Sequence, residues 1–222
     1  MKKRHELYPY ADGSRFAGRP AAEVFAAIAR SNTWAGEESL SGTGSSLQQT
    51  AVLVEKLPKL LRELGVDNML DIPCGDFNWM QTVDLSGIQY TGADIVESLV
   101  LANRQRYRHL SRRFLHMDLK QDELGAYGLV FCRDCLVHFS FADVFSAIGN
   151  IKSSGSRYLM MTTFPAEPSN LDIDTGGWRP LNFGLPPFSF PPPLILLNEQ
   201  CTEMGGAFAD KSMGVWAVEQ LP

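Results

Sequence analysis

The stretch Met69-Leu-Asp-Ile-Pro-Cys-Gly-Asp-Phe-Asn-Trp79 begins with apolar residues typical of a buried strand and ends in a turn built around Gly75. A glycine in such a turn lets the backbone approach a ligand closely. The first strand-to-helix turn is also the usual cofactor contact in a doubly wound α/β sheet. Nucleotide-binding turns usually carry two or three glycines, whereas this stretch carries Gly75 alone. By itself, the stretch fits either a cofactor loop or an ordinary β-turn before a helix.

Short apolar runs alternate with helical patterns along the chain from residue 66 onward. Strands that alternate with helices predict βαβ units and a mainly parallel, doubly wound α/β sheet. Two further apolar runs near the end are expected to pair antiparallel as a C-terminal hairpin. The expected strands cover 68–72, 89–93, 113–117, 128–132 and 157–162, the helices between them cover 79–83, 96–107 and 141–151, and the hairpin strands cover 194–197 and 214–218.

The N-terminal part is predicted to contain helices over 20–32 and 47–64. Ser45 or Ser46 would cap the second helix. Pro58 lies inside it and predicts a kink or a break, because proline removes a backbone donor and clashes with the preceding turn.

These patterns divide the chain into two parts. Residues 1–46 are expected to form an N-terminal helix and lid segment, and residues 47–222 a cofactor-binding domain. Within the second part, the proline-rich insertion 163–193 is expected to contain no regular element, because prolines punctuate it throughout.

The 222 residues carry a formal net charge of −5, and 45% of them are hydrophobic, as in an ordinary globular domain. An acidic balance disfavours a nucleic-acid partner, because phosphate contacts need basic surface. No apolar run reaches the roughly 18–20 residues of a membrane span. The N-terminus also lacks the apolar run of a signal peptide. We therefore expect a cytoplasmic protein without a membrane partner.

Cys132 and Cys135 form a C-x-x-C pattern. A zinc site needs two further ligands at comparable spacing, and the sequence has no second such pair. The pattern is interpreted as two small, half-buried thiols, and no metal site is predicted.

Acidic residues follow the first three predicted strands. Asp71 ends the first, Asp94 follows the second about twenty residues after the glycine turn, and Asp118 follows the third. A carboxylate accepts two hydrogen bonds, so Asp94 suits the two hydroxyls of a ribose. Asp118 is at the level where an adenine amino group would be bound. Each acid alone is compatible with a solvated turn, but three at successive strand ends favour a nucleoside-type cofactor.

In these motifs the sequence resembles the class I S-adenosylmethionine-dependent methyltransferases. The resemblance covers roughly 47–219 and rests on Leu70-Asp-Ile-Pro-Cys-Gly75, on Asp94 and Asp118, on the fourth strand Gly128–Cys132 with the Arg133-Asp134 that follows, and on the final hairpin. It implies a Rossmann-like, seven-stranded sheet with an antiparallel last strand. It also implies S-adenosylmethionine as cofactor and S-adenosylhomocysteine as product. The sequence departs from the family pattern where Pro73 and Phe77 stand in place of glycines.

The resemblance assigns the parts of the cofactor to positions in this chain. Asp71 and Gly75 would lie near the methionine portion, Asp94 at the ribose, and Asp118 and Leu119 beside the adenine. The polar segment before the second helix offers backbone amides for the cofactor carboxylate; its alternative interpretation is a flexible linker. The residues expected to bind the cofactor are Trp34, Ser39, Gly42, Ser45, Asp71, Pro73, Gly75, Asp94, Ile95, Asp118, Leu119 and Arg133.

The residues after the fourth strand are candidates for the reaction itself. Asp134 and His138 are predicted to be catalytic, since histidine is suited to removing a proton at neutral pH and Asp134 would orient it or act on an amine. The alternative is that both are turn, capping or packing residues.

Residues of the insertion are expected to form the acceptor side. Trp178 would supply a flat apolar face, Arg179 would pair with an anionic group, and Arg133 and Asn182 are assigned to the same site. The alternative is a proline-rich surface loop. The predicted activity is methyl transfer to an oxygen or nitrogen of a small polar, possibly anionic, molecule. Two alternatives are a non-catalytic cofactor- or nucleoside-binding protein and a methyltransferase acting on a protein or nucleic acid.

Overall fold

The computed structural model describes residues 4–222, and its seven strands form a single sheet in the order β3-β2-β1-β4-β5-β7-β6. Strand β7 runs antiparallel to both neighbours, whereas the pairings among the first five strands are parallel. The predicted mainly parallel sheet with a terminal antiparallel hairpin is confirmed. The strands are β1 Asn68–Asp71, β2 Gln89–Asp94, β3 Arg112–His116, β4 Leu129–Cys132, β5 Tyr158–Thr163, β6 Ile195–Asn198 and β7 Ser212–Ala217.

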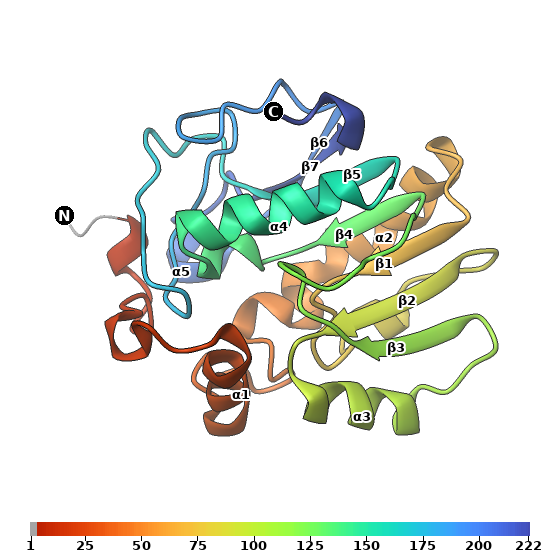
Figure 1. Cartoon of the computed structure of the whole chain (residues 1–222), viewed down its shortest axis with the longest axis horizontal. Coiled ribbons are helices and arrows are strands. Elements are labelled where there is room, and N and C mark those ends of the chain that lie inside the picture. Colours follow the sequence, from red (N-terminus) through yellow and green to blue (C-terminus); the bar gives the residue numbers. More distant parts are fainter. Residues whose placement is uncertain (1–3) are drawn as a thin grey trace.

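Helices cover both faces of the sheet, which makes the molecule a three-layer structure (Figure 1). The carboxyl ends of β1 to β4 face the side on which α1 lies (Figure 1). Strand order reverses between β1 and β4, and ligands of open α/β sheets bind beyond the strand ends at such a reversal. The helices are α1 Ala21–Ser31, α2 Leu47–Glu63, α3 Glu97–Arg106, α4 Phe141–Ser153 and α5 Glu203–Gly206, with single 3-10 turns at Arg4–Glu6, Ser14–Phe16, Thr43–Ser45, Met80–Thr82, Leu136–His138 and Val218–Gln220.

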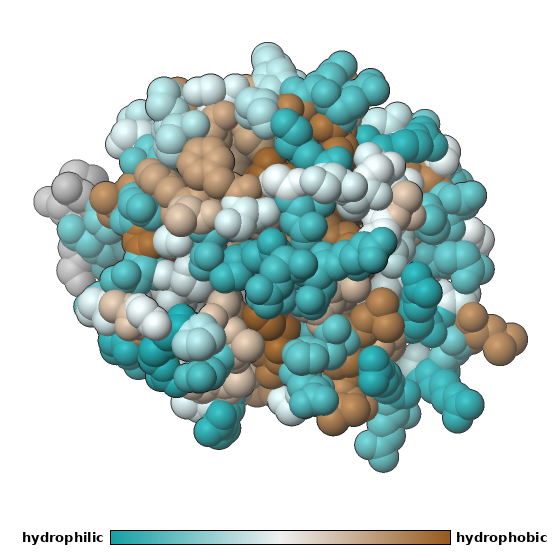
Figure 2. All heavy atoms as spheres, in the orientation of Figure 1, coloured by the Kyte–Doolittle hydropathy of each residue, from teal (hydrophilic) through white to brown (hydrophobic). Residues whose placement is uncertain are grey.

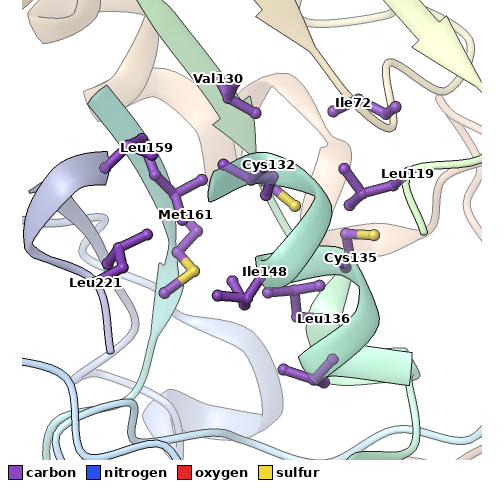
Figure 3. Packing of buried hydrophobic residues seen from close by; sticks show 14 of the residues in the cluster. Ile72, Leu119, Val130, Cys132, Cys135, Leu136, Ile148, Leu159, Met161 and Leu221 are labelled. Atoms are coloured by element: carbon purple, nitrogen blue, oxygen red, sulfur yellow. The ribbon is translucent and has the colours of Figure 1, made fainter. Parts of the chain in front are cut away.

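Alternating side chains of the strands fill two separate cores. Met69 of β1 packs with the buried leucines of α2, whereas its neighbour Leu70 packs on the opposite face with α4. This follows from the period of two residues along a strand. Figure 3 shows the α4 side, where Val130, Leu159 and Met161 point toward Ile148. Both faces are buried, as expected for parallel strands.

Helix α2 continues through Pro58, so of the two expected outcomes, a kink or a break, the break is wrong. Its buried face carries Leu53, Leu57, Leu60 and Leu61. Packing of such a face contributes more to helix stability than intrinsic propensity does, so this contact outweighs the backbone bond that proline removes.

The predicted helix over 79–83 is also wrong, because this region forms only the 3-10 turn Met80–Thr82. Trp79 and Met80 are nevertheless buried. The apolar run correctly indicated buried side chains, but it is too short to form a full helix.

The proline-rich insertion contains no helix or strand between β5 and β6, as predicted. It is not a loose loop, because Leu181, Phe183, Phe188 and Phe190 are buried in the core on the α4 side. The indole of Trp216 in β7 also donates a hydrogen bond to the carbonyl of Pro191, at 2.8 Å. The insertion therefore covers the sheet beside α4, where a further helix would otherwise be needed.

Polar residues occupy much of the surface on the α4 side, with apolar residues in patches between them (Figure 2). Among residues 4–222, none of the helices combines the length and apolar character needed to cross a membrane.

We predict that Ser46→Ala lowers the free energy of unfolding by about 1 kcal/mol. The Ser46 hydroxyl caps α2 by accepting a hydrogen bond from the backbone N–H of Gln49, at 3.3 Å. Urea denaturation measures the change. The control is Ser146→Ala, which removes an exposed hydroxyl inside α4 and should change stability by less than about 0.5 kcal/mol. Equal effects of the two substitutions would contradict the assignment of Ser46 as the cap.

Candidate active site

The turn after β1 is built around Gly75. Its φ angle of +53° lies in the left-handed region that favours glycine. The Gly75 N–H donates to Oδ2 of Asp94 at 2.9 Å, and its carbonyl accepts from Nδ2 of Asn103 at 2.7 Å. A Cβ at this position would lie 2.1 Å from Oγ of Ser41. The single glycine is therefore required both by the backbone conformation and by the close approach of the N-terminal segment.

The three acids predicted at the strand ends come together at this edge of the sheet and line one chamber. Burial raises the pKa of Asp71 to about 7, although a hydrogen bond from the Tyr90 hydroxyl opposes the shift. Burial likewise raises the pKa of Asp94 to about 6, against the backbone donors Val96 and Gly75. Asp118 is half-buried and accepts from the N–H of Lys120 at 2.9 Å. Each of these carboxylates retains lone pairs for a ligand.

The chamber encloses about 1030 Å³, including its opening to solvent. Apolar side chains alternate with the acids along its wall. The lining includes the predicted cofactor residues Trp34, Ser45, Asp71, Pro73, Gly75, Asp94, Ile95, Asp118, Leu119 and Arg133, and also Phe25, Leu99, Met117, Cys135 and Phe139.

The segment between α1 and α2 lies over this chamber and is fixed at both ends. Asp76, in the turn after β1, accepts hydrogen bonds from the hydroxyl of Ser39 and the N–H of Leu40, both at 2.8 Å. At the other end, the hydroxyl of Thr43 donates to Glu203, at 2.7 Å. Ser39 thus holds the lid in place and does not line either chamber.

A buried group of charges follows β4. Oδ2 of Asp134 lies 2.5 Å from Nζ of Lys211 and 3.2 Å from the Arg133 guanidinium. Arg133 also contacts Glu199 at 2.7 Å and donates to the carbonyl of Gly44 at 2.8 Å. Burial alone would raise the pKa of Asp134, but Lys211 and Arg133 outweigh it and lower that pKa to about 2. Asp134 is therefore an ionised, paired carboxylate with little affinity for a proton.

His138 lies beside Asp134 with its ring stacked on Trp34, at 4.6 Å between centroids. Its Nδ1 is 2.7 Å from the carbonyl oxygen of Gly177. A carbonyl only accepts, so Nδ1 carries the proton and Nε2 has the free lone pair. Burial lowers the pKa of His138 to about 4. The imidazole is thus neutral at pH 7, with one nitrogen able to accept a proton.

A second chamber of about 430 Å³ adjoins the first. The two chambers share Trp34, Ser41, Asp134 and His138 as wall residues. The second chamber also contains the predicted residues Gly42 and Trp178. Its remaining lining residues, which the sequence interpretation missed, are Tyr8, Tyr10, Thr43, Gly44, Phe164, Glu203, Phe208 and Lys211. The only available signal for them was the pair of tyrosines in an otherwise polar N-terminal segment.

Arg179 and Asn182 do not line either chamber. Arg179 is fully buried, and its guanidinium donates to the carbonyls of Leu136, Phe139 and Leu171. The side chain of Asn182 binds backbone carbonyls of the insertion. Both residues therefore hold the insertion in shape, in contrast to the acceptor-binding roles expected for them. A basic or amide side chain in a loop gives no sequence signal that separates these two uses.

Cys132 and Cys135 lie within the apolar core on the α4 side, close to Leu119 and Leu136 (Figure 3). Both thiols are buried and free. Within residues 4–222, no group of three or more His, Cys, Asp or Glu residues is arranged to hold a metal ion.

Comparison with known proteins identifies the fold of this chain. No family model and no curated protein sequence matches the chain. Among solved structures, human N-acetylserotonin methyltransferase in complex with S-adenosylmethionine is similar at a TM-score of 0.59 and 14% identity, covering 90% of this chain and 60% of that one. Magnesium protoporphyrin IX methyltransferase from Synechocystis matches at a TM-score of 0.48 and 17% identity, covering 70% of this chain and 82% of that one.

The chain thus spans about 60% of the length of the human enzyme. Together with the strand order and the antiparallel β7, this likeness shows that the chain has the Rossmann-like fold of the class I S-adenosylmethionine-dependent methyltransferases.

We predict that Gly75→Ala lowers the free energy of unfolding by about 3 kcal/mol or more. The left-handed backbone costs a side chain roughly 1–2 kcal/mol, and overpacking against Ser41 adds a comparable amount. The control is Gly87→Ala, at φ +82° with no atom within 4 Å of the new Cβ, which should show only the backbone cost. Equal losses for both substitutions in urea denaturation would show that Ser41 does not pack against Gly75.

We predict that Arg179→Met lowers the free energy of unfolding by about 3 kcal/mol or more, because two buried carbonyls and one partly buried carbonyl lose their donor. Arg157→Met is the matched control. Arg157 also donates to two carbonyls, those of Leu64 and Gly65, but it is exposed and water replaces it. That change should cost less than about 1 kcal/mol. A stable Arg179→Met protein would contradict the structural role of Arg179.

Proposed function

We propose that the protein is an S-adenosylmethionine-dependent methyltransferase that acts on an oxygen or nitrogen of a small polar molecule. The observation that carries this proposal is the pair of adjoining chambers, which share Trp34, Ser41, Asp134 and His138. One chamber has the acids and apolar surfaces that suit the cofactor. The other is a separate space for an acceptor. A methyl donor in the first chamber and an acceptor in the second would lie next to each other at these shared residues, as direct transfer requires.

The first chamber fits the chemistry of the cofactor along its length. Asp94 is the candidate for the ribose hydroxyls, because it is buried and its carboxylate has lone pairs beyond those used by Gly75 and Val96. Asp118 and the apolar Ile95 and Leu119 suit a flat adenine with an exocyclic amine. Asp71 supplies carboxyl oxygens that can accept hydrogen bonds from the methionine end.

When bound, S-adenosylmethionine supplies an activated methyl group on a positively charged sulfur. The contribution of the protein is alignment and exclusion of water. Trp34 and the lid segment cover the junction between the chambers, while Asp134 is held by Lys211 and Arg133.

His138 is the proposed proton acceptor. It is neutral, its Nε2 is free of a proton, and the fixed negative charge of Asp134 favours its protonated form. Asp134, with a pKa of about 2, is assigned the supporting electrostatic role. An ionised carboxylate that is paired with two cations is a poor base.

We predict that isothermal titration shows binding of S-adenosylhomocysteine and that Asp94→Asn weakens it about 100-fold. The carboxylate would accept hydrogen bonds from two ribose hydroxyls, and bonds to a charged group are worth roughly 1.5–3 kcal/mol each. The control is Asp84→Asn, an exposed turn residue that contacts Ser86 and lines neither chamber.

Thermal unfolding without ligand checks that the Asp94→Asn protein remains folded. Absence of S-adenosylhomocysteine binding to the unmodified protein at millimolar concentration would refute the proposed function. Unchanged affinity in folded Asp94→Asn would refute the assignment of the ribose site alone.

A further inference from the structure

The ionised side chains around the second chamber carry a net negative charge. Among residues 4–222, the charged side chains that line it are Asp134, Glu203 and Lys211. The single cation, Lys211, is already engaged by Asp134 at 2.5 Å and lies 3.9 Å from Glu199. Arg133, next to it in the first chamber, is held by Asp134 and Glu199. The two cations therefore face three carboxylates, counting Glu203, and no positive group is left for an anionic acceptor.

The carboxylates converge on one point of the chamber. A Cβ added to Gly44 would lie 3.1 Å from Oε2 of Glu203, and 3.5 Å from both Oδ2 of Asp134 and Nζ of Lys211. Oε1 of Glu203 accepts from the Thr43 hydroxyl at 2.7 Å, and Oε2, which faces Gly44, accepts from the Cys201 thiol at 3.7 Å. Lys211 is paired with Asp134, so the carboxylate of Glu203 gives the space beside Gly44 a net negative charge.

The other walls of this chamber are aromatic and come from distant parts of the chain. Tyr8 and Tyr10 belong to the N-terminal segment, Phe164 and Trp178 belong to the insertion, and Phe208 precedes β7. Tyr8 stacks against Tyr10 and Phe208 at 5.0 and 5.4 Å. Aromatic faces attract cations, most strongly where water is excluded.

The tyrosines respond to the same negative field. Burial, and then the Glu203 carboxylate, raise the pKa of Tyr8 and of Tyr10 above the ordinary tyrosine value. Both hydroxyls thus stay protonated and neutral, so the aromatic wall adds no competing negative group and no positive one.

We propose that the second chamber binds an organic amine, whose ammonium group lies between Glu203, Asp134 and the aromatic wall, and that this amine is the methyl acceptor. This inference rests on the proposed function and specifies its acceptor as a cation. It replaces the expectation of an anionic acceptor, because Arg133 is paired and Arg179 lies outside both chambers.

The proposed methyl transfer balances with His138 as the proton acceptor and the sulfonium of the cofactor as the methyl donor. The ammonium gives one proton to Nε2 of His138, which passes it to solvent. The nitrogen lone pair then forms the new N–C bond to the methyl group. The C–S bond breaks with its electron pair on sulfur, so the positive charge of the sulfonium passes to the methylated amine and the sulfur becomes a neutral thioether.

The test compares two probes of similar size and opposite charge, 2-phenylethylammonium and 3-phenylpropionate. Isothermal titration measures their binding to the full-length protein saturated with S-adenosylhomocysteine. We expect the ammonium to bind at least about tenfold more tightly than the carboxylate, which corresponds to roughly 1.4 kcal/mol. We also expect Glu203→Gln to weaken binding of the ammonium about tenfold. Glutamine retains an oxygen that can accept a hydrogen bond from Thr43, so this substitution removes the negative charge and keeps that contact.

Glu63→Gln is the matched control, since Glu63 is exposed at the end of α2, pairs with Lys59 and lines neither chamber. It should leave the affinity for the ammonium unchanged. Equal or tighter binding of 3-phenylpropionate to the unmodified protein would overturn the inference while S-adenosylhomocysteine binding kept the proposed function intact. Loss of S-adenosylhomocysteine binding would instead overturn both. An unchanged ammonium affinity in folded Glu203→Gln would also overturn the inference.

Discussion

The ion pairs that join Asp134, Arg133, Glu199 and Lys211 connect the parts of the chain that build the site. They link the end of β4 to the segment between β6 and β7, and Arg133 extends the connection to the lid through the carbonyl of Gly44. Charges removed from water are costly unless they are paired with good geometry. Arg133, Glu199 and Lys211 are all nearly fully buried. The arrangement therefore fixes the relative positions of three segments that a purely apolar contact would leave free to slide.

The same arrangement sets the chemistry of the junction between the chambers. Asp134 is kept ionised by its two cationic partners, and the neutral His138 lies within its field. The pairing also consumes the positive charge that an anionic ligand would need. As a result, the excess negative charge of Glu203 decides the character of the second chamber. One network thus supports the fold, places a fixed negative charge beside the proposed base, and underlies the proposal of an amine as acceptor.

The N-terminal segment and the insertion supply chamber walls that the sheet does not provide. Arg4 lies between Glu167 and Asp210 and brings Tyr8 and Tyr10 to the second chamber. The backbone of Trp178 donates to the carbonyl of Ala11, at 3.0 Å, so the two segments also bind each other. The expected division at residue 46 separates the lid from the sheet, yet residues on both sides of it are needed to line each chamber.

The sequence by itself determined the alternation of strands and helices, the terminal hairpin and the acids at the ends of β1, β2 and β3. These features depend on local hydrophobic periodicity and on the common direction of parallel strands. Both can be recognised from residues that are close together in the sequence. Tertiary structure alone decided that Pro58 stays within a helix, that Arg179 binds backbone carbonyls and that Glu203 and Lys211 face Asp134. These outcomes depend on contacts between residues far apart in the chain. The residues that neighbour a charged side chain in the sequence do not indicate whether its partner will be a carbonyl, another charge or a ligand.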